Sequence, residues 1–293
     1  MPFTFSHPAA ILPFRKVSRL SHTGLVIGSI VPDLEFYFKL RLDENIGHTL
    51  SGILLFDLPV AFLVAFVFHT LVKKPLYNAS PLWIQVKVNH LMNCDWVQTI
   101  KERTAMVLLS IFIGIGSHML FDGMTHYDGW MVAYFPFLAE EFNIGAYGLH
   151  LYDMLQYGLS LLGLYSILII WQNLNESGFS QNKLQHAVRF WIMTLLGAGL
   201  SIAYRMIFYP EFISFWDVFM MSMGALFYGV LIASLVEFII SKISGSNSQH
   251  DEFVNSRGAY PRFKGRALLV KQDESFGMFR KGIMHMYYLI DKT

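Results

Sequence analysis

The chain has 293 residues, of which 54% are hydrophobic and only 15% are charged, and its mean hydropathy is +0.43. Soluble domains carry about 25% charged residues, so this composition indicates a membrane protein. The formal net charge of +1 argues against a nucleic acid as partner, because no run of Lys and Arg is dense enough to neutralise a phosphate backbone. The single Cys94 excludes an internal disulfide.

The first fourteen residues carry no charge, and two prolines, Pro8 and Pro13, interrupt their apolar run. This pattern is not that of a cleavable signal peptide, which begins with positive charge and continues as an unbroken apolar stretch. The segment Pro2–Phe14 is also too short to cross a bilayer as an α-helix. We expect it to lie along the membrane surface or to dip in beside a helical bundle.

A helix needs about 20 apolar residues to cross the hydrocarbon core. Five stretches meet this requirement, namely Leu50–Val72, Thr104–Gly123, Leu149–Trp171, Val188–Phe208 and Val218–Ile240. A sixth, Leu20–Phe38, is interrupted by Pro32-Asp33-Leu34-Glu35, whose carboxylates should face a cavity or the interface. The sequence therefore predicts an all-α, polytopic transmembrane bundle of about six spans over residues 1–240. A flexible cytoplasmic tail over 241–293, with a Ser- and Gly-rich linker at its start, would follow.

The loop charges predict the orientation of these spans. The loop between the second and third spans is rich in cations, whereas residues 126–148 contain no Lys or Arg. Because cytoplasmic loops are enriched in Lys and Arg, the first loop is expected inside and the second outside. Six spans with both termini cytoplasmic fit this distribution, although Lys39 and Arg41 in a short outer loop oppose it.

The most informative stretch is SHMLFDGMTH, at the end of the third span. On a helix of about 3.6 residues per turn, His118, Asp122 and His126 lie within an arc of roughly 80°. Two imidazoles and a carboxylate on successive turns can converge on one divalent ion or on a short proton relay. Gly123 weakens the helix here, so the helix is expected to end before His126, and that side chain would then approach from a loop.

The predicted topology brings other polar residues to the same outer face. Asp33 and Glu35 fall near the outer end of the first span, His48 directly precedes the second, and His150 and Asp153 open the fourth. Residues far apart in the sequence would thus form one site. His7 precedes an inner cationic cluster, and it reaches this face only if the N-terminal segment inserts or the topology differs.

A cluster of His and Asp suits Zn²⁺ or another first-row divalent ion. A water in a vacant coordination position would have its pKa lowered from about 15.7 to about 7, which makes it a hydrolytic nucleophile. Asp33 is a candidate ligand or general base, and Glu35 a candidate base. Two ions roughly 3.5–4 Å apart would suit phosphoester hydrolysis.

Non-catalytic interpretations remain open for the same residues. A polar stripe on a transmembrane helix can hydrogen-bond across the bundle without a metal. Asp57, beside Pro59, is expected to bond to neighbouring helices or to backbone groups freed by the proline. The aromatic stretch Gly129–Phe142 is interpreted as an interfacial loop, or alternatively as a lid over the site.

Several motifs resemble a known family. They are MPFTFSH at the start, Val-Pro-Asp-Leu at 31–34, His48-Thr-Leu-Ser-Gly, Leu55-Phe56-Asp57-Leu58-Pro59, the block from Ser117-His118 to His126, and Leu155-Gln156-Tyr157-Gly158. Over about residues 1–240 they are similar to domain-of-unknown-function family 4184, a group of bacterial integral-membrane proteins. The resemblance implies that this family's polar positions are His7, Asp33, His48, His118, Asp122 and His126. More distantly, their order is similar to predicted membrane-bound metal-dependent hydrolases, although only Gly47-His48-Thr49 stands where those hydrolases have a fuller motif.

The leading hypothesis is a metal-dependent, phosphoesterase-like hydrolase of the bacterial inner membrane. Its divalent ion, expected to be Zn²⁺, would be bound at the outer face by the six polar positions. The substrate would be a lipid or cell-envelope phosphoester. The alternative is a non-catalytic membrane protein, such as a transporter, proton relay or assembly factor, with a structural His/Asp cluster.

Overall fold

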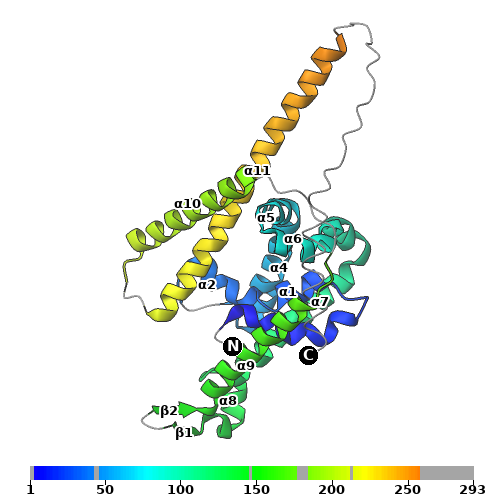
Figure 1. The fold of residues 1–293 in the computed structure, drawn as a ribbon. Helices are drawn as coiled ribbons and strands as arrows, with labels where there is room; N and C mark the ends of the chain where they lie inside the picture. The colour runs from blue at the N-terminus through cyan, green and yellow to red at the C-terminus, as the bar shows by residue number, and fades with distance from the viewer. Residues whose placement is uncertain (1–2, 43–45, 145–146, 177–183, 212–213, 258–293) are drawn as a thin grey trace, which may run out of the picture. The chain divides into compact units, whose positions relative to one another are not determined.

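The structure is a computed structural model, and it describes residues 3–42, 46–144, 147–176, 184–211 and 214–257. Contacts between residues divide the chain into two units, Met1–Ser244 and Gly245–Thr293. The first unit contains the helices considered below and one small β-hairpin (Figure 1). Most of the predicted tail lies outside the described residues.

Five helices in the described part of the chain are long and apolar enough to cross a membrane. Four of them are α7 (Trp96–Thr125), α9 (Leu151–Gln172), α10 (Leu184–Phe208) and the span within α11 (Phe215–Arg257). The fifth, Leu50–Ala79, joins α3 (Leu50–Gly52), η3 (Ile53–Asp57), α4 (Leu58–Val67), η4 (Phe68–Val72) and α5 (Lys73–Ala79). These helices confirm the five clear candidates and the fold class. The chain is an integral membrane protein.

The sixth predicted span is not one helix. Residues 20–38 form α1 (His22–Gly28), the turn η2 (Val31–Asp33) and the start of α2 (Leu34–Lys39). The break has a local cause, because Pro32 has no N–H and disfavours α-helical backbone at the residue before it. Of the about six predicted spans, five are therefore long helices among the described residues, and the interrupted sixth candidate consists of shorter ones.

The N-terminal segment inserts beside the bundle. Residues Thr4–Lys16 form a 3-10 helix, η1, which contains Pro8 and Pro13 and packs against α9 and α7. Thr4, Ser6 and His7 are buried, with relative exposures of 1%, 0% and 0%. His7 could approach the site only if the N-terminal segment inserted, and this condition is met.

Helix α1 lies against α7 with almost no space between the two backbones. Gly24 and Gly28 form a small-xxx-small pattern on α1; Gly24 faces Ser110 of α7, and Gly28 lies against Gly114. A Cβ atom on Gly114 would lie 2.5 Å from the Leu25 carbonyl oxygen and 2.7 Å from the Ser29 nitrogen. Small residues permit this approach, since lipid tails provide no hydrophobic force to drive helices together. Consequently Ser29 lies beside the next turn of α7, which carries His118.

The remaining elements are short, apart from the end of α11. α8 (Trp130–Tyr134), η6 (Pro136–Ala139) and an antiparallel hairpin of β1 (Glu141–Ile144) and β2 (Tyr147–His150) fill the segment between α7 and α9. α6 (Leu82–Val88) and η5 (Asn89–Asn93) connect α5 to α7. α11 continues through the predicted linker to Arg257. A helix tolerates this sequence, because a Gly inside it costs only about 1 kcal/mol.

Candidate metal centre

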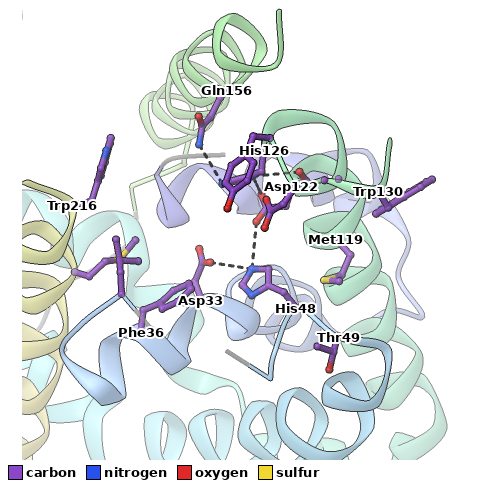
Figure 2. A pocket seen from close by; sticks show the side chains of 16 residues that line it. Asp33, Phe36, His48, Thr49, Met119, Asp122, His126, Trp130, Gln156 and Trp216 are labelled. Atoms are coloured by element: carbon purple, nitrogen blue, oxygen red, sulfur yellow. Dashed lines mark hydrogen bonds and ion pairs between the residues drawn. The ribbon is translucent and has the colours of Figure 1, made fainter. Parts of the chain in front are cut away.

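Three separate segments contribute to one group of four side chains. Asp33 ends η2, His48 lies in the loop before α3, and His118 and Asp122 occupy successive turns of α7. Each offers one ligand atom, and these four atoms lie within 4.8 Å of one another. Figure 2 shows Asp33, His48 and Asp122 converging on the same cavity. The structure thus unites four of the six predicted ligands.

The distances within this group match those of a small coordination sphere. His48 Nε2 lies 3.2 Å from His118 Nε2, 3.5 Å from Asp33 Oδ1 and 3.4 Å from Asp122 Oδ2. His118 Nε2 lies 3.6 Å from Asp33 Oδ1 and 3.2 Å from Asp122 Oδ2. Tetrahedral ligands about 2.0–2.1 Å from a zinc ion are separated by roughly 3.3 Å. The donor set, two imidazoles and two carboxylates, therefore fits a divalent ion in both chemistry and spacing.

The orientation of His118 is fixed by its second ring nitrogen. His118 Nδ1 lies 2.9 Å from the Ser29 carbonyl oxygen, in a fully buried position. A carbonyl can only accept, so Nδ1 carries the proton, and in the neutral ring Nε2 presents its lone pair to the group. A backbone carbonyl behind a histidine ligand is the usual arrangement in metal sites. Here the close packing of α1 on α7 places the Ser29 carbonyl behind His118.

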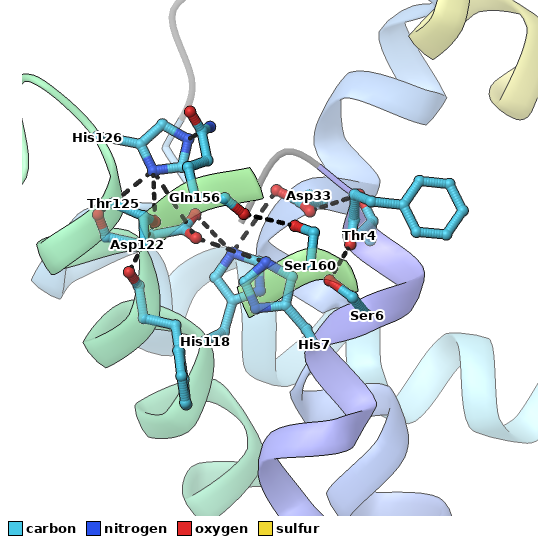
Figure 3. A network of polar contacts seen from close by, with 12 residues as sticks. Thr4, Ser6, His7, Asp33, His118, Asp122, Thr125, His126, Gln156 and Ser160 are labelled. Carbon is cyan, nitrogen blue, oxygen red and sulfur yellow. Dashed lines mark hydrogen bonds and ion pairs between the residues drawn. The ribbon is translucent and has the colours of Figure 1, made fainter. Parts of the chain in front are cut away.

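Asp33 has a comparable supporting contact. The Thr4 hydroxyl donates to Asp33 Oδ2 at 2.6 Å, and both residues are buried (Figure 3). This bond occupies one carboxylate oxygen and leaves Oδ1 facing the two histidines. The N-terminal 3-10 helix therefore positions the carboxylate that the sequence nominated as ligand or general base.

The predicted base Glu35 lies outside the four-residue group. Its Oε2 accepts hydrogen bonds from the backbone amides of Ile46 and Gly47 at 2.8 and 3.0 Å, and its Oε1 pairs with Lys39 at 2.8 Å. Both oxygens are therefore engaged away from the site. These contacts hold the loop that delivers His48, which gives Glu35 a positioning role in this structure.

The two carboxylates make the group attractive to positive charge. Burial lowers the pKa of His48, but the hydrogen bonds and negative charges of Asp122 and Asp33 outweigh that effect and raise it to about 10. In the absence of another cation, a proton on this imidazole would balance the carboxylates. A divalent ion would satisfy the same electrostatic demand.

His7 and His126 contact the group and do not belong to the four. His7 Nε2 lies 3.4 Å from Asp122 Oδ1, and its ring stacks on His118 with centroids 3.9 Å apart. His126 follows the end of α7 at Thr125, as predicted, and its Nδ1 lies 3.8 Å from Asp122 Oδ1. The Gln156 amide donates to His126 Nε2 at 3.2 Å. Figure 3 shows both imidazoles flanking Asp122.

Three other polar residues named from the sequence do not join the group. His150 and Asp153 pair with each other at 3.5 Å and are half-buried. Asp57 is fully buried, but neither of its carboxylate oxygens has a hydrogen-bond partner among the described residues. The expectation that Asp57 bonds to neighbouring helices was therefore wrong. A Cβ atom on Gly47 would lie 3.1 Å from Asp57 Oδ1, so this carboxyl supports the loop of His48 from behind.

The group opens into a cavity of about 1040 Å³. Besides Asp33, His48 and Asp122, its walls include His126, Gln156 and Asp128, and an apolar set from four segments, Phe36, Leu42, Met119, Trp130, Trp216 and Met220. Figure 2 shows Trp216 and Trp130 on opposite sides of the polar centre. Gly129 and Trp130 come from the aromatic loop, so this loop forms part of the cavity wall.

Sequence reasoning did not identify Thr4, Ser29 or Gln156 as parts of the site. The Thr4 hydroxyl bonds to Asp33, and the Ser29 carbonyl bonds to His118. Such supporting groups are not metal ligands themselves, so a search of the sequence for ligand residues does not find them. The spacing Gly24-x-x-x-Gly28 was a usable signal, since it indicates close helix packing next to Ser29. Gln156 was noted only within a family motif.

Comparison with known proteins agrees with the motifs. The family described as "Domain of unknown function (DUF4184)" matches residues 1–235, which include all six predicted ligands. No curated protein and no solved structure matches the chain. The buried His/Asp group and the five long apolar helices therefore occur in a member of the DUF4184 family, to which this chain belongs.

Proposed function

We propose that this protein is a metal-dependent hydrolase of the bacterial inner membrane that cleaves a phosphoester at the outer face of the bilayer. One observation carries the proposal: four ligand atoms lie within 4.8 Å, and a backbone carbonyl fixes the tautomer of one of them. Asp33, His48, His118 and Asp122 would hold the ion. Two nitrogens and two oxygens in this spacing favour Zn²⁺. A bound ion would supply Lewis-acid activation of water and of the phosphoryl group.

The cavity supports a lipid as substrate. A volume of about 1040 Å³ is at the upper end of the range for small-molecule sites, roughly 300–1,000 Å³. Its polar centre is bordered by Phe36, Trp216 and Met220, which can accept an acyl or isoprenoid chain. A lipid would then place its phosphoester headgroup at the polar centre and its hydrocarbon chain along the apolar wall.

The charge of the cavity favours a phosphodiester over a phosphomonoester. Among the described residues that line it, Asp33, Asp122 and Asp128 are acidic and none is Lys or Arg. Three carboxylates and one divalent ion leave net negative charge, which repels a dianionic monoester more strongly than a monoanionic diester.

Bound metal is the direct test. The protein, purified in mild detergent without a His tag, is analysed for metals by mass spectrometry beside His118→Ala and Asp122→Ala. His150→Ala is the matched control, because His150 lies near the same end of the bundle outside the group. We expect near-stoichiometric metal in wild type and control and loss of metal in both site variants. A wild type that stays metal-free after reconstitution with Zn²⁺, Mn²⁺ and Fe²⁺ would refute the proposal.

Activity is then measured with matched lipids. The loaded protein is incubated with phosphatidylglycerol, a diester, and phosphatidic acid, a monoester, and the products are followed by liquid chromatography and mass spectrometry. Hydrolysis of the diester that requires both metal and Asp122 is the expected result.

A non-catalytic protein is the second candidate, and one observation favours it. Among the residues that the structure describes, fully buried Asp57 has no hydrogen-bond partner at either carboxylate oxygen, and fully buried His7 has only the ion pair of its Nε2 with Asp122. Unsatisfied ionisable groups inside a bundle are typical of proton paths. A metal-free protein whose reconstituted vesicles show proton flux that Asp57→Asn abolishes would establish this alternative.

A further inference from the structure

The N-terminal region, residues 4–39, contains two arms joined by a cationic turn. η1 forms the first arm, and α1, η2 and α2 form the second. At the end of η1 and in the turn after it, Arg15, Lys16 and Arg19 are exposed, together with Phe14 at 36% and Val17 at 43% relative exposure. No Asp or Glu occurs between Thr4 and Pro32. The turn therefore combines exposed cations with apolar side chains and lacks neutralising acids.

The open end of these two arms lies at the candidate metal centre. In the first arm Thr4 donates to Asp33, and His7 stacks on His118. In the second arm the Ser29 carbonyl accepts from His118 Nδ1. Both arms therefore reach the same level of α7, two turns before its end at Thr125.

The turn lies toward the other end of the bundle. The Ser21 amide donates to the Ser110 hydroxyl at 2.8 Å, and Ser110 lies eight residues before His118 on α7. At 1.5 Å per residue this is a descent of about 12 Å. Thr23 Oγ1 lies 3.1 Å from His69 Nε2, four residues before Lys73. The chain thus passes from the level of the site toward the end of the span that carries Lys73.

That end of the bundle is cationic in several other segments. Lys73 and Lys74 lie in α5, at the end of the helix Leu50–Ala79, Lys87 lies in α6, and Lys101 and Arg103 lie in the first turns of α7. Three cations near the site end are engaged: Lys39 pairs with Glu35, and Arg41 lies 4.8 Å above the ring of Tyr209. The third, Arg205, donates from Nε to the Leu40 carbonyl at 3.3 Å.

We infer that residues 4–39 form a hairpin that enters the bilayer from the side of the metal centre, and that its tip, Arg15–Arg19, binds anionic phospholipid headgroups of the opposite leaflet. Exposed cations flanked by Phe14 and Val17 match this partner, because the apolar side chains enter the acyl region while the cations contact phosphates. A hairpin returns the chain to the face it came from. Thr4 and Lys39 therefore lie on the face of the site, whereas a cytoplasmic N-terminal segment had been expected from the loop charges.

The lone native cysteine makes the topology testable. Cys94 is exposed in the segment between α6 and α7, near the cationic end. Ser18→Cys at the tip and Asn143→Cys in β1 are each introduced into a Cys94→Ser background. Single-cysteine proteins in sealed vesicles are treated with a membrane-impermeant maleimide. We expect Ser18→Cys to react from the same side as native Cys94 and Asn143→Cys from the opposite side. Reaction of Ser18→Cys from the side of Asn143→Cys overturns the hairpin.

Lipid binding is measured separately, by native mass spectrometry of protein with bound phosphatidylglycerol or phosphatidylcholine. In wild type the anionic lipid should be retained preferentially. The triple variant R15Q/K16Q/R19Q should lose about 100-fold in this preference, since each cation near an anionic surface contributes roughly fivefold. The matched control K74Q/K101Q/R103Q removes three exposed cations of the same end outside the tip. Equal losses in both triple variants, or none in the first, overturn the lipid site. Neither assay depends on bound metal or on hydrolysis.

Discussion

The contact between α1 and α7 provides a sharp test of how the metal centre is built. In Gly114→Ala the new Cβ would lie 2.5 Å from the Leu25 carbonyl oxygen and 2.7 Å from the Ser29 nitrogen. Ordinary contacts between such heavy atoms begin above 3 Å, so α1 must withdraw by roughly 1 Å. The bond from His118 Nδ1 to Ser29, now 2.9 Å, would then exceed hydrogen-bonding distance.

The expected cost has two parts. Overpacking of this kind destabilises a protein by about 1–3 kcal/mol, and loss of a supporting contact behind a histidine ligand lowers metal affinity about 10- to 100-fold. Gly116→Ala is the control, since a Cβ there meets nothing within 4 Å and the helix should gain up to about 1 kcal/mol. Zn²⁺ affinity is measured by competition with a chelating dye, and stability by thermal unfolding in detergent. If Gly114→Ala binds metal and unfolds like Gly116→Ala, the packing of α1 does not orient His118.

Four further outcomes are expected. Thr4→Val, which removes the hydroxyl bonded to Asp33, should weaken Zn²⁺ binding about tenfold in the same competition assay; unchanged affinity would refute the role of the N-terminal helix. Glu35→Gln should weaken the contacts to the loop of His48 and lower the melting temperature, whereas an unaltered melting temperature contradicts its positioning role. Asp57→Asn should leave bound metal unchanged and raise the melting temperature, because a buried carboxyl without partners destabilises the fold. If metal is present at 100 times its Kd, a chelator removes about 2.7 kcal/mol from the free energy of unfolding of the wild type and so lowers its melting temperature. The melting temperature of Asp122→Ala should not change.

The sequence alone determined the parts that depend on composition and local periodicity. Five long apolar runs predicted five spans, because a helix must satisfy its own backbone inside a bilayer. His118 and Asp122 were predicted to share a face because helical geometry places residues four apart together. Pro32 marked the interruption in residues 20–38, although the sequence could not show that it divides the segment into short helices.

Tertiary structure decided which polar residues meet. His48 and Asp33 join His118 and Asp122 because the loop before α3 and the turn η2 reach the same point, and no periodicity relates these segments. Glu35 is only two residues from Asp33, yet it faces the amides of Ile46 and Gly47. Asp33 and Leu34 both have helical dihedrals, so residues two apart point to opposite sides of this segment, and packing decides which side faces the site.

The place of the N-terminal segment was also beyond sequence reasoning. Its length and prolines excluded an α-helical span, but its path depends on packing against α7 and α9, which come together only in the folded bundle. Close approach at Gly28 and Gly114 then brings a backbone carbonyl to His118. The sequence therefore determined which elements form and which residues can bind metal. The folded bundle decided which of them converge, because short-range steric contacts between distant segments set the positions of the ligand atoms.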